Sequence, residues 1–244
     1  MNTSYFVDMG NTRWKYLNKD DSESGIKQHL YQEDPVTGMI KVLDGLDLPA
    51  HFVISSVRSG SLNQGLQAYL QEQGCTIRWI TWRDCIEINT AYEDPAALCI
   101  DRYLNMVAAL RLYQPPLIIV DAGTAVTADA LDNSGAHLGG CIFPGKRLLM
   151  QALNQQTDKI HVEDVRGNDT IFARSTSAGV AAGVSYGLTA AIKSMIENMK
   201  KELGKNTTVL FTGGDARWLA DAIRDFETKV DLTLLFSGLR FLDG

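Results

Sequence analysis

The hydrophobic positions of this chain alternate between two periods. Short apolar runs with the length of buried strands occur in the first half at residues 3–9, 52–57 and 76–81. Between and after them, apolar residues return at helical spacing, at 62–73 and again from Ile100 to Ala108. Strands that alternate in this way with amphipathic helices predict an α/β fold.

The second half of the chain repeats the same order. Residues 117–121 predict a buried strand, and 125–131 predict its hairpin partner. A long helix is expected from 177 to 203, and a last short strand at 231–235. In the first half, Asp94-Pro95 has the pattern of a helix N-cap followed by proline at the first helical position.

A break in the pattern divides these two halves. Pro115-Pro116 cannot continue the preceding helical stretch, so we place the domain boundary there. The expected domains are 1–114 and 115–244. Because each half opens with a similar strand, we expect a duplicated domain around a central cleft.

Composition narrows the possible functions. The chain has 244 residues with 45% hydrophobic and 21% charged residues, which is typical of a globular protein. Its 23 basic and 29 acidic residues give a net charge of −6, which argues against broad nucleic-acid binding. We expect neither a signal peptide nor a membrane span. The four cysteines lack C-x-x-C spacing, so we expect free thiols in a reducing cytoplasm rather than a zinc site.

Two acid–glycine turns are the first candidates for chemistry. Each has an aspartate near the end of an apolar strand, then a glycine and hydroxyl or amide side chains, at residues 8–12 and 121–124. Glycine lets a ligand approach the backbone, and a carboxylate beside N–H and hydroxyl donors suits a metal-bound phosphate. One such pair alone is more often an ordinary turn. Two copies, one in each half, favour a ligand site.

A third candidate is the segment from Tyr92 to Arg102. Asp101 and Arg102 lie near the start of the expected helix, where successive side chains point in different directions. One carboxylate and one guanidinium can then border a cleft with separate tasks. The alternative is a solvated acid–base pair.

Three glycines in the long helix form a further pattern. Gly179, Gly183 and Gly187 follow one another at intervals of four and leave a bare line along the helix. Each glycine costs a helix about 1 kcal/mol, so this line suggests the close approach of another backbone or of a ligand. Close helix packing is the simpler reading, and a dimer interface is one form of it.

Six blocks in order along the chain carry a resemblance to a known family. They are Asp8-Met9-Gly10-Asn11-Thr12 with Lys15, Tyr92 to Arg102, Asp121 to Thr124, Gly139 to Gly145, Thr176 with Gly183, and Thr212 to Gly214. Through them the chain resembles type III pantothenate kinase, the bacterial enzyme of the first step of coenzyme A synthesis. Cys99 departs from the family, which usually has glycine there, so a side chain is expected to crowd the pantothenate pocket.

The resemblance implies a fold and a set of ligands. The fold is that of the acetate kinase–Hsp70–actin type, with two ribonuclease-H-like domains and a nucleotide in the central cleft. The ligands are ATP, Mg²⁺, a monovalent cation (K⁺ or NH₄⁺) and pantothenate. The family also implies a cytoplasmic homodimer.

The resemblance also assigns roles to residues. Asp101 accepts the proton of the pantothenate hydroxyl, Asp8 holds Mg²⁺ through water, and Asp121 coordinates the monovalent cation. The expected ATP-binding residues are Asp8, Met9, Gly10, Asn11, Thr12, Arg13, Trp14, Lys15 and Thr124. The expected pantothenate-binding residues are Tyr92, Cys99, Ile100, Asp101, Arg102 and Thr176.

Two other functions remain open at this point. A sugar kinase or polyphosphate phosphatase of the same fold would use both acid–glycine turns, but it would not explain the segment from Tyr92 to Arg102 as a unit. A regulatory protein that binds nucleotide without turnover would not need intact aspartates at 8, 101 and 121. We therefore favour the kinase.

Overall fold

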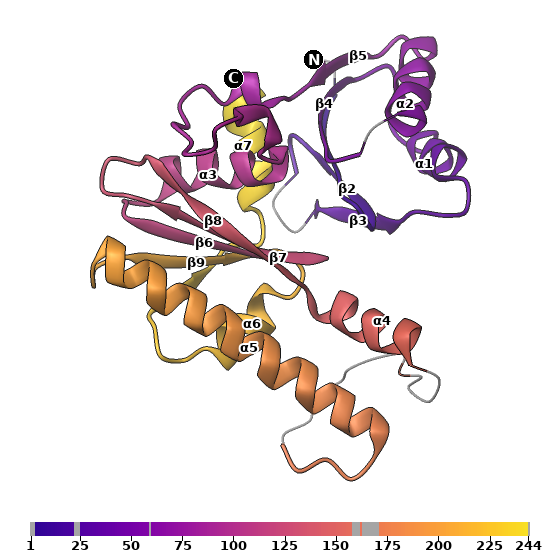
Figure 1. Ribbon diagram of the computed structural model, residues 1–244. Helices are drawn as coiled ribbons and strands as arrows, with labels where there is room; N and C mark the ends of the chain where they lie inside the picture. The colour runs from indigo at the N-terminus through magenta and orange to yellow at the C-terminus, as the bar shows by residue number, and fades with distance from the viewer. Residues whose placement is uncertain (1–2, 22–24, 59, 158–161, 163–170, 244) are drawn as a thin grey trace. The chain divides into compact units, whose positions relative to one another are not determined.

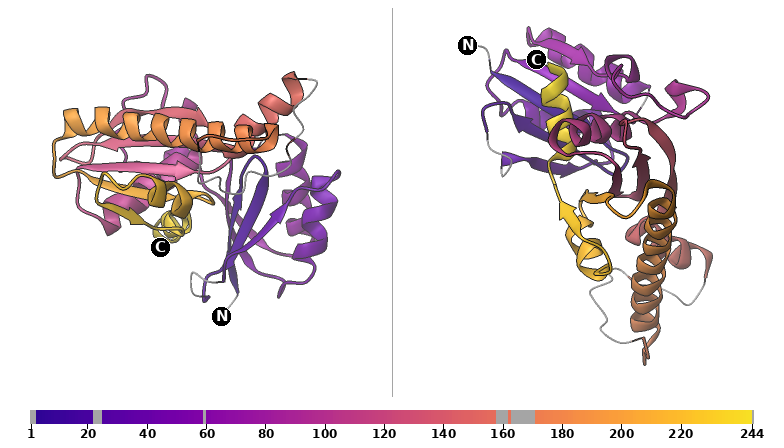
Figure 2. Two further views of the ribbon diagram at one scale, coloured as in Figure 1. Left: turned by 90° about the horizontal axis from the view of Figure 1, so that it is seen from below. Right: turned by 90° about the vertical axis from the view of Figure 1, so that its left-hand side faces the viewer.

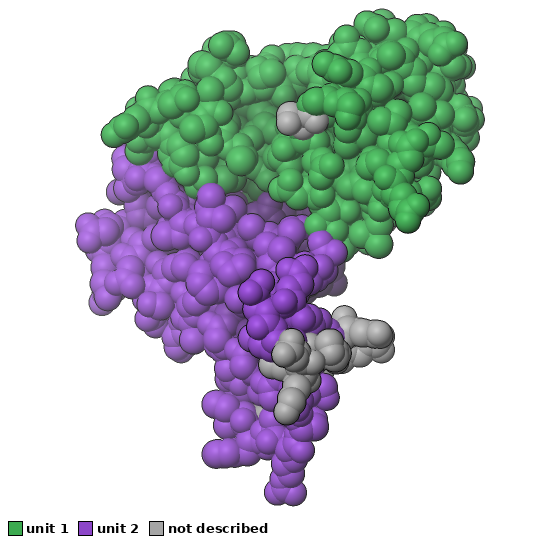
Figure 3. Space-filling model, turned by 45° about the vertical axis from the view of Figure 1, so that its right-hand side comes forward, with its two compact units in different colours: residues 1–112, 233–244 green, residues 113–232 purple. Residues whose placement is uncertain are grey.

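The structure is a computed structural model that describes residues 3–21, 25–58, 60–157, 162 and 171–243 (Figure 1). The polar sequence of residues 155–169 predicts a loop, and this segment lies mostly outside the described residues. The chain divides into two compact units, coloured separately in Figure 3. Unit 1 is Met1–Leu112 with Thr233–Gly244, and unit 2 is Tyr113–Leu232.

Unit 1 is built on a five-stranded sheet of order β3-β2-β1-β4-β5. Its strands are β1 (Ser4–Met9), β2 (Arg13–Asn18), β3 (Lys27–Leu30), β4 (His51–Ser56) and β5 (Thr76–Trp79). The first three strands are antiparallel neighbours, whereas β4 and β5 run parallel to β1. Its helices are α1 (Pro35–Leu43), α2 (Ser61–Glu72), α3 (Ile100–Leu112) and α7 (Leu234–Asp243).

Unit 2 repeats this topology. Its sheet has the order β10-β9-β6-β7-β8, made of β6 (Leu117–Ala122), β7 (Ala125–Leu131), β8 (His137–Pro144), β9 (Thr208–Thr212) and β10 (Thr228–Val230). Again the first three strands are antiparallel and the last two join in parallel. The helices are α4 (Lys146–Gln156), α5 (Thr176–Leu203) and α6 (Ala216–Ala222). The predicted duplication of an α/β domain is confirmed.

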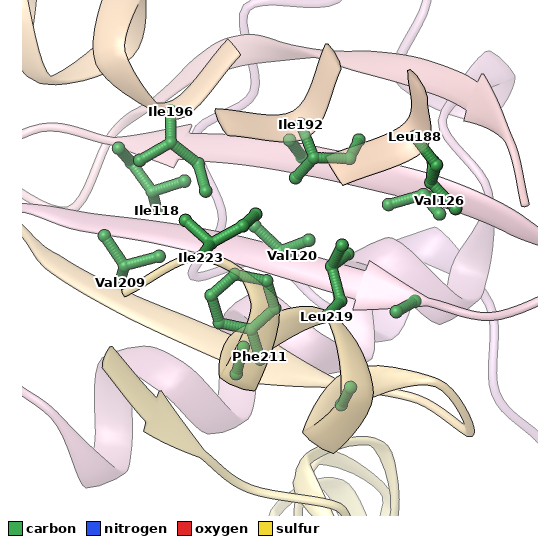
Figure 4. Packing of buried hydrophobic residues seen from close by; sticks show 14 residues of the cluster. Ile118, Val120, Val126, Leu188, Ile192, Ile196, Val209, Phe211, Leu219 and Ile223 are labelled. Atoms are coloured by element: carbon green, nitrogen blue, oxygen red, sulfur yellow. The ribbon is translucent and has the colours of Figure 1, made fainter. Parts of the chain in front are cut away.

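The long helix α5 runs along the sheet of unit 2 (Figures 1 and 2). Its residues Leu188, Ile192 and Ile196 are buried in one cluster with residues of β6, β7 and β9 (Figure 4). The helix begins at the N-cap Ser175 and ends at Gly204, which has a φ of +95°. Among the described residues, α5 alone is long and apolar enough to cross a membrane, a test that core helices of soluble proteins also pass. Of its apolar 18-residue window, 39% is buried inside the structure.

The C-terminal segment corrects two expectations. The expected strand at 231–235 is wrong, because β10 ends at Val230 and the helix α7 begins at Leu234. Phe236 and Leu239 of α7 are buried with Phe6 and Leu104 of unit 1. The last residues therefore belong to unit 1, whereas the sequence placed them in the second domain.

Close contact between α3 and α7 explains this assignment. Gly238 lies against Leu104, and a Cβ at Gly238 would come within 2.9 Å of the carbonyl carbon of Leu104. The absence of a side chain thus lets the two helix backbones approach each other.

The segment before α3 also differs from expectation. Asp94 does cap a helix, with its side chain accepting a hydrogen bond from the Ala96 amide at 2.9 Å. That helix is a short 3₁₀ turn, Pro95–Ala97, and α3 begins separately at Ile100. The extended backbone of Leu98 ends the turn, so the Asp94-Pro95 signal marks a turn before the helix rather than the helix itself.

Candidate functional site

The first acid–glycine turn joins β1 to β2. Asp8 lies opposite Lys15 on one side and Ser55 on the other, in the registers of β2 and β4. Its side chain is buried, at 7% exposure, and one carboxylate oxygen lies 3.3 Å from the Ser55 hydroxyl, which donates to it. The turn thus holds a carboxylate and places a lysine at the position across from it.

Gly10 allows this turn to be tight. A Cβ at Gly10 would lie 3.0 Å from the carbonyl oxygen of Arg13, closer than most real contacts of this kind. The absence of a side chain at Gly10 therefore lets the backbone turn closely between β1 and β2. Arg13 is exposed and donates a hydrogen bond to the Gln28 side chain at 3.0 Å.

Two residues of the predicted ATP set have core side chains. Met9 is 0% exposed and Trp14 is 1% exposed, and both pack in the hydrophobic cluster of unit 1. The Trp14 ring also stacks on His29, with 4.9 Å between ring centroids. Only the backbone of Met9 and Trp14 is thus suited to face a ligand, because alternate strand residues point to opposite faces.

Tyr92 and Arg102 form a pair within unit 1. Arg102 is 3% exposed, and its Nη1 donates to the Tyr92 hydroxyl at 2.7 Å. The Arg102 guanidinium also lies over the Tyr92 ring, 5.3 Å from its centroid. The ring and the hydrogen bond fix the direction of this guanidinium, as a site for an oxygen-rich ligand requires.

Asp101 lies in the first turn of α3, next to this pair. One oxygen of its carboxylate accepts a hydrogen bond from the backbone N–H of Arg102 at 2.8 Å. The N-terminus of a helix also stabilises a negative charge. Asp101 is therefore a partly buried, oriented carboxylate, rather than one half of a solvated acid–base pair.

Cys99 directly precedes α3 and is exposed. Its carbonyl accepts from the backbone N–H groups of Arg102 at 3.2 Å and Tyr103 at 3.4 Å, so it takes part in the first turn of the helix. Partial burial and the nearby Asp101 carboxylate raise the pKa of the Cys99 thiol. The thiol is consequently neutral at physiological pH. Ile100, the first residue of α3, packs in part against the cluster beneath α3 and α7.

The second acid–glycine turn joins β6 to β7 in unit 2. Asp121 lies opposite Thr127 in the register of β7 and opposite Thr212 in that of β9. The Gly123 amide donates to the Ala125 carbonyl at 3.0 Å, which closes the turn.

Two distant glycines pack directly on this second turn. A Cβ at Gly145 would lie 2.5 Å from the carbonyl oxygens of both Gly123 and Thr124. Gly213 has a φ of +92°, and a Cβ there would overlap the Asp121 carboxylate and lie 2.6 Å from the Ala122 oxygen. The turn is therefore enclosed by backbone. The sequence blocks at 139–145 and 212–214 pointed to Gly145 and Gly213, but the predicted site set omitted both.

Thr176 is the first residue of α5 and is exposed. The preceding Ser175 caps the helix by accepting from the Ala178 amide at 3.2 Å. Thr176 thus stands at a helix N-terminus, where N–H groups and the helix dipole favour anionic groups. It belongs to unit 2, whereas the other predicted pantothenate residues belong to unit 1.

The residues present fit Mg²⁺ and ATP. Among the described residues, no group of three or more His, Cys, Asp or Glu side chains forms a metal cage. Mg²⁺ in kinases is held by one or two carboxylates together with substrate phosphates, so a single buried Asp8 across from Lys15 suits it. The turn at Gly10 is tight, and the backbone N–H groups of turns of this kind can bind phosphate oxygens.

Comparison with known proteins decides the family. The sequence model of type III pantothenate kinase matches residues 5–198. The chain belongs to the type III pantothenate kinase family. It is 29% identical to the type III pantothenate kinase of Dichelobacter nodosus, over 96% of this chain and 94% of that protein. It is 35% identical to that of Azotobacter vinelandii, over 78% of each chain.

Solved structures support the fold of this family. A Baf-family protein of Campylobacter jejuni superposes with a TM-score of 0.63 and 22% identity, covering 98% of this chain and 96% of that one. The activator of 2-hydroxyisocaproyl-CoA dehydratase from Clostridium difficile, solved with bound ADPNP, gives a TM-score of 0.52 and 14% identity, covering 99% and 94%. The actin/Hsp70-like architecture with two ribonuclease-H-like domains is confirmed.

Proposed function

We propose that this protein transfers the γ-phosphoryl group of ATP to the primary hydroxyl of pantothenate. The products are ADP and 4′-phosphopantothenate, which is the first intermediate on the way to coenzyme A. The observation that carries the proposal is the Tyr92–Arg102 pair beside the oriented Asp101 carboxylate. Acid–glycine turns occur in many kinases of this fold, but this arrangement fits an acceptor that has both a hydroxyl and a carboxylate.

Asp101 is proposed as the general base. Phosphoryl transfer depends mostly on positioning and charge stabilisation, so a carboxylate that accepts the hydroxyl proton suffices. The Arg102 amide fixes the direction of that carboxylate. The Arg102 guanidinium and the Tyr92 hydroxyl bind the oxygens of pantothenate. Thr176 at the start of α5 is proposed as a further pantothenate-binding residue, on its resemblance to the family.

The first acid–glycine turn is proposed to hold the polyphosphate and its metal. Asp8 binds Mg²⁺ through water, because Mg²⁺ dehydrates reluctantly. Bound Mg²⁺ neutralises charge on the phosphates during transfer. Lys15 and the backbone from Gly10 to Thr12 bind phosphate oxygens. Thr124 of the second turn is proposed as a further phosphate-binding residue, on its resemblance to the family.

Asp121 is proposed as the ligand of a monovalent cation. Its register neighbours are the hydroxyl residues Thr127 and Thr212. Carbonyl oxygens of Ala122 and Thr124 belong to the same turn. Neutral hydroxyl and carbonyl oxygens around one carboxylate can coordinate a monovalent cation such as K⁺ or NH₄⁺.

The active form is proposed to be a cytoplasmic homodimer. Cβ atoms built at Gly183 and Gly187 meet no described atom within 4 Å, although glycine weakens a helix. Tyr186, between them, is 46% exposed. A second copy that packs on this line would explain both features. Light scattering coupled to size-exclusion chromatography tests it, and Gly183→Glu is the variant expected to give monomers.

The deciding experiment is ATP turnover with pantothenate, with and without K⁺. ADP release and the mass of the product are measured together. A gain of one phosphoryl group that depends on K⁺ supports both the reaction and the cation. ATP binding without turnover would favour the nucleotide-binding regulator, and phosphorylation of a sugar would favour the sugar kinase.

The Asp101→Asn variant tests the role of the base. Removal of the proton acceptor should lower kcat by about 100-fold or more, while ATP binding stays unchanged. Asp20→Asn is the matched control, because Asp20 is an exposed residue of the turn after β2. Near-normal turnover in Asp101→Asn would contradict the assignment.

A further inference from the structure

Arg58 lies two residues after the end of β4, and both its backbone N–H and its carbonyl are hydrogen-bonded. Its amide donates to the Ser56 hydroxyl at 3.0 Å, and its carbonyl accepts from the Asn63 side chain at 2.9 Å. Ser56 ends β4, and Asn63 lies in the first turn of α2. The amide of Val57 also donates to the Met9 carbonyl at 3.1 Å, which ties this segment to the end of β1. A residue anchored in this way presents its side chain from a rigid base.

The side chain of Arg58 lies on the first acid–glycine turn. Its Nη1 donates to the carbonyl oxygen of Asn11 at 3.1 Å. The guanidinium lies over the Tyr31 ring, with 5.1 Å between its central carbon and the ring centroid. Arg58 therefore joins β4 to the turn that is proposed to receive the phosphates.

Most of the donors of this guanidinium stay available. A guanidinium has five N–H groups, and the bond to Asn11 uses one of them. Within the described part of the chain, Arg58 makes no ion pair and its side chain donates to no other acceptor. The Asn11 carbonyl carries no charge and so does not neutralise the guanidinium, which can still form a charge-assisted hydrogen bond with an anion.

The Tyr31 ring supports the Arg58 guanidinium through a cation–π contact. Burial raises the pKa of its hydroxyl well above the ordinary value, and the charges of Arg58 and Asp8 act on it in opposite directions. The hydroxyl thus stays protonated and is no candidate base. The Tyr31 ring therefore serves Arg58 as a contact surface only.

We propose that Arg58 is a further phosphate-binding residue of this site, which positions the turn through Asn11 and donates its remaining N–H groups to the polyphosphate of ATP. The proposal deepens the proposed function and depends on it only for the identity of the nucleotide. It adds a second cation to Lys15 from a strand outside the β1–β2 hairpin.

Nucleotide binding measured by calorimetry tests this proposal without turnover. Mg·ATP and adenosine are titrated into the wild type, Arg58→Met and Arg58→Lys. Arg58→Met should weaken Mg·ATP binding by about tenfold or more, since a charge-assisted hydrogen bond is lost, and should leave adenosine binding unchanged. Arg58→Lys should recover part of the affinity, because the charge remains but the fork of donors does not.

Arg83→Met is the matched control. Its guanidinium also lies over an aromatic ring, 4.6 Å from the centroid of Trp82, but in an exposed 3₁₀ turn. It should bind Mg·ATP as the wild type does. If Arg58→Met does not fold, two Tyr31 variants test the same proposal. Tyr31→Phe keeps the aromatic ring under Arg58 and should keep the Mg·ATP affinity. Tyr31→Leu removes the ring contact, leaves the Arg58 side chain less fixed and should weaken Mg·ATP binding about threefold.

The outcomes separate this proposal from the proposed function. Unchanged Mg·ATP affinity in Arg58→Met, or equal losses for Mg·ATP and adenosine, would overturn the role of Arg58. Mg·ATP binding that depends on Arg58 in a protein without pantothenate turnover would refute the proposed function alone. A folded wild type that binds no Mg·ATP would refute both.

Discussion

The two acid–glycine turns have the same topology but different surroundings. Each follows the first strand of its unit, and each aspartate has a hydroxyl residue beside it on the parallel strand, Ser55 in unit 1 and Thr212 in unit 2. Across the hairpin, however, Asp8 faces Lys15, whereas Asp121 faces Thr127.

Contacts from outside each hairpin also differ between the two turns. The first turn receives the guanidinium of Arg58 on the Asn11 carbonyl. The second turn packs against the backbone at Gly145 and Gly213. The duplicated fold therefore places the cationic residues Lys15 and Arg58 at the first turn. At the second turn it places hydroxyl residues beside the aspartate. The difference lies in the residues that neighbouring strands bring to each turn.

The largest expected difference between the two turns is in the effects of Asp8→Asn and Asp121→Asn, which test the proposed Mg²⁺ and K⁺ sites. Asp8→Asn should lower kcat/KM for ATP by about 100-fold at any K⁺ concentration, because the Mg²⁺-binding charge is lost. Asp121→Asn should instead raise the K⁺ concentration for half-maximal activity by about tenfold. Initial rates over a matrix of Mg·ATP and K⁺ concentrations measure both. Identical kinetic defects in the two variants would remove the distinction between the turns.

Substitution of Gly213 tests the backbone packing of the second turn. Gly213→Ala should destabilise unit 2 by about 3 kcal/mol, because a Cβ would overlap Asp121 and Ala122 and the φ is positive. The neighbouring Gly214→Ala is the control, since a Cβ there meets no described atom within 4 Å. Urea unfolding followed by circular dichroism measures the difference. Equal stabilities of the two variants would show that the enclosure is not tight.

A charge placed in the second turn should make it resemble the first. Thr127→Lys puts an ammonium group at the position across from Asp121, where it can take the place of the monovalent cation. Activity should then lose its dependence on K⁺, with a smaller change in the maximal rate than in either aspartate variant. Thr127→Met, a neutral chain of comparable size, should keep the K⁺ response. Persistent K⁺ dependence in Thr127→Lys would place the cation elsewhere.

The smallest expected effect is on folding stability, from one ion pair in each unit. Asp243 of α7 is paired with Lys19 at 2.6 Å and lies 3.3 Å from His51, with 8% of its side chain exposed. Burial acts to raise the pKa of Asp243, but the bonds and charges of Lys19 and His51 outweigh it and lower the pKa. Asp243→Asn should therefore cost about 1 kcal/mol of stability at neutral pH.

The stability contributed by the Asp243 carboxylate should depend on pH. A carboxylate with a lowered folded pKa stabilises the protein above the ordinary value of about 3.9, and this contribution is lost as the pH falls through the folded pKa. The gap between wild type and Asp243→Asn should thus close in acid. Asp225→Asn in unit 2 is the comparison, because Asp225 and its partner Lys193 are both exposed and the variant should unfold like the wild type. A constant gap at all pH values would contradict the role of the charge.

Much of this protein was predictable from local sequence. The strand ending at Asp121 and the helix α5 were predicted within one residue of their observed ends, because the apolar period is a local property that burial selects. The paired acid–glycine turns were also predictable, since a strand fixes the direction in which the next residues leave it. Within the site, Tyr92, Asp101 and Arg102 were predicted as a unit, and the structure brings them together.

The remaining features depend on contacts between segments far apart in the chain. Burial of Met9 and Trp14 removes two side chains from the predicted ATP set, and it follows from the packing of the whole cluster. The return of α7 to unit 1 follows from its fit to α3 at Gly238.

Sequence alone thus determined the duplicated α/β plan and the residue types at each turn. Only the tertiary structure placed Arg58 on the Asn11 carbonyl and Gly213 beneath Asp121. The physical reason is the distance along the chain over which each effect acts. Periodicity and turn preference act over a few residues, whereas the neighbours of a turn come from strands that pair only when the whole sheet has formed.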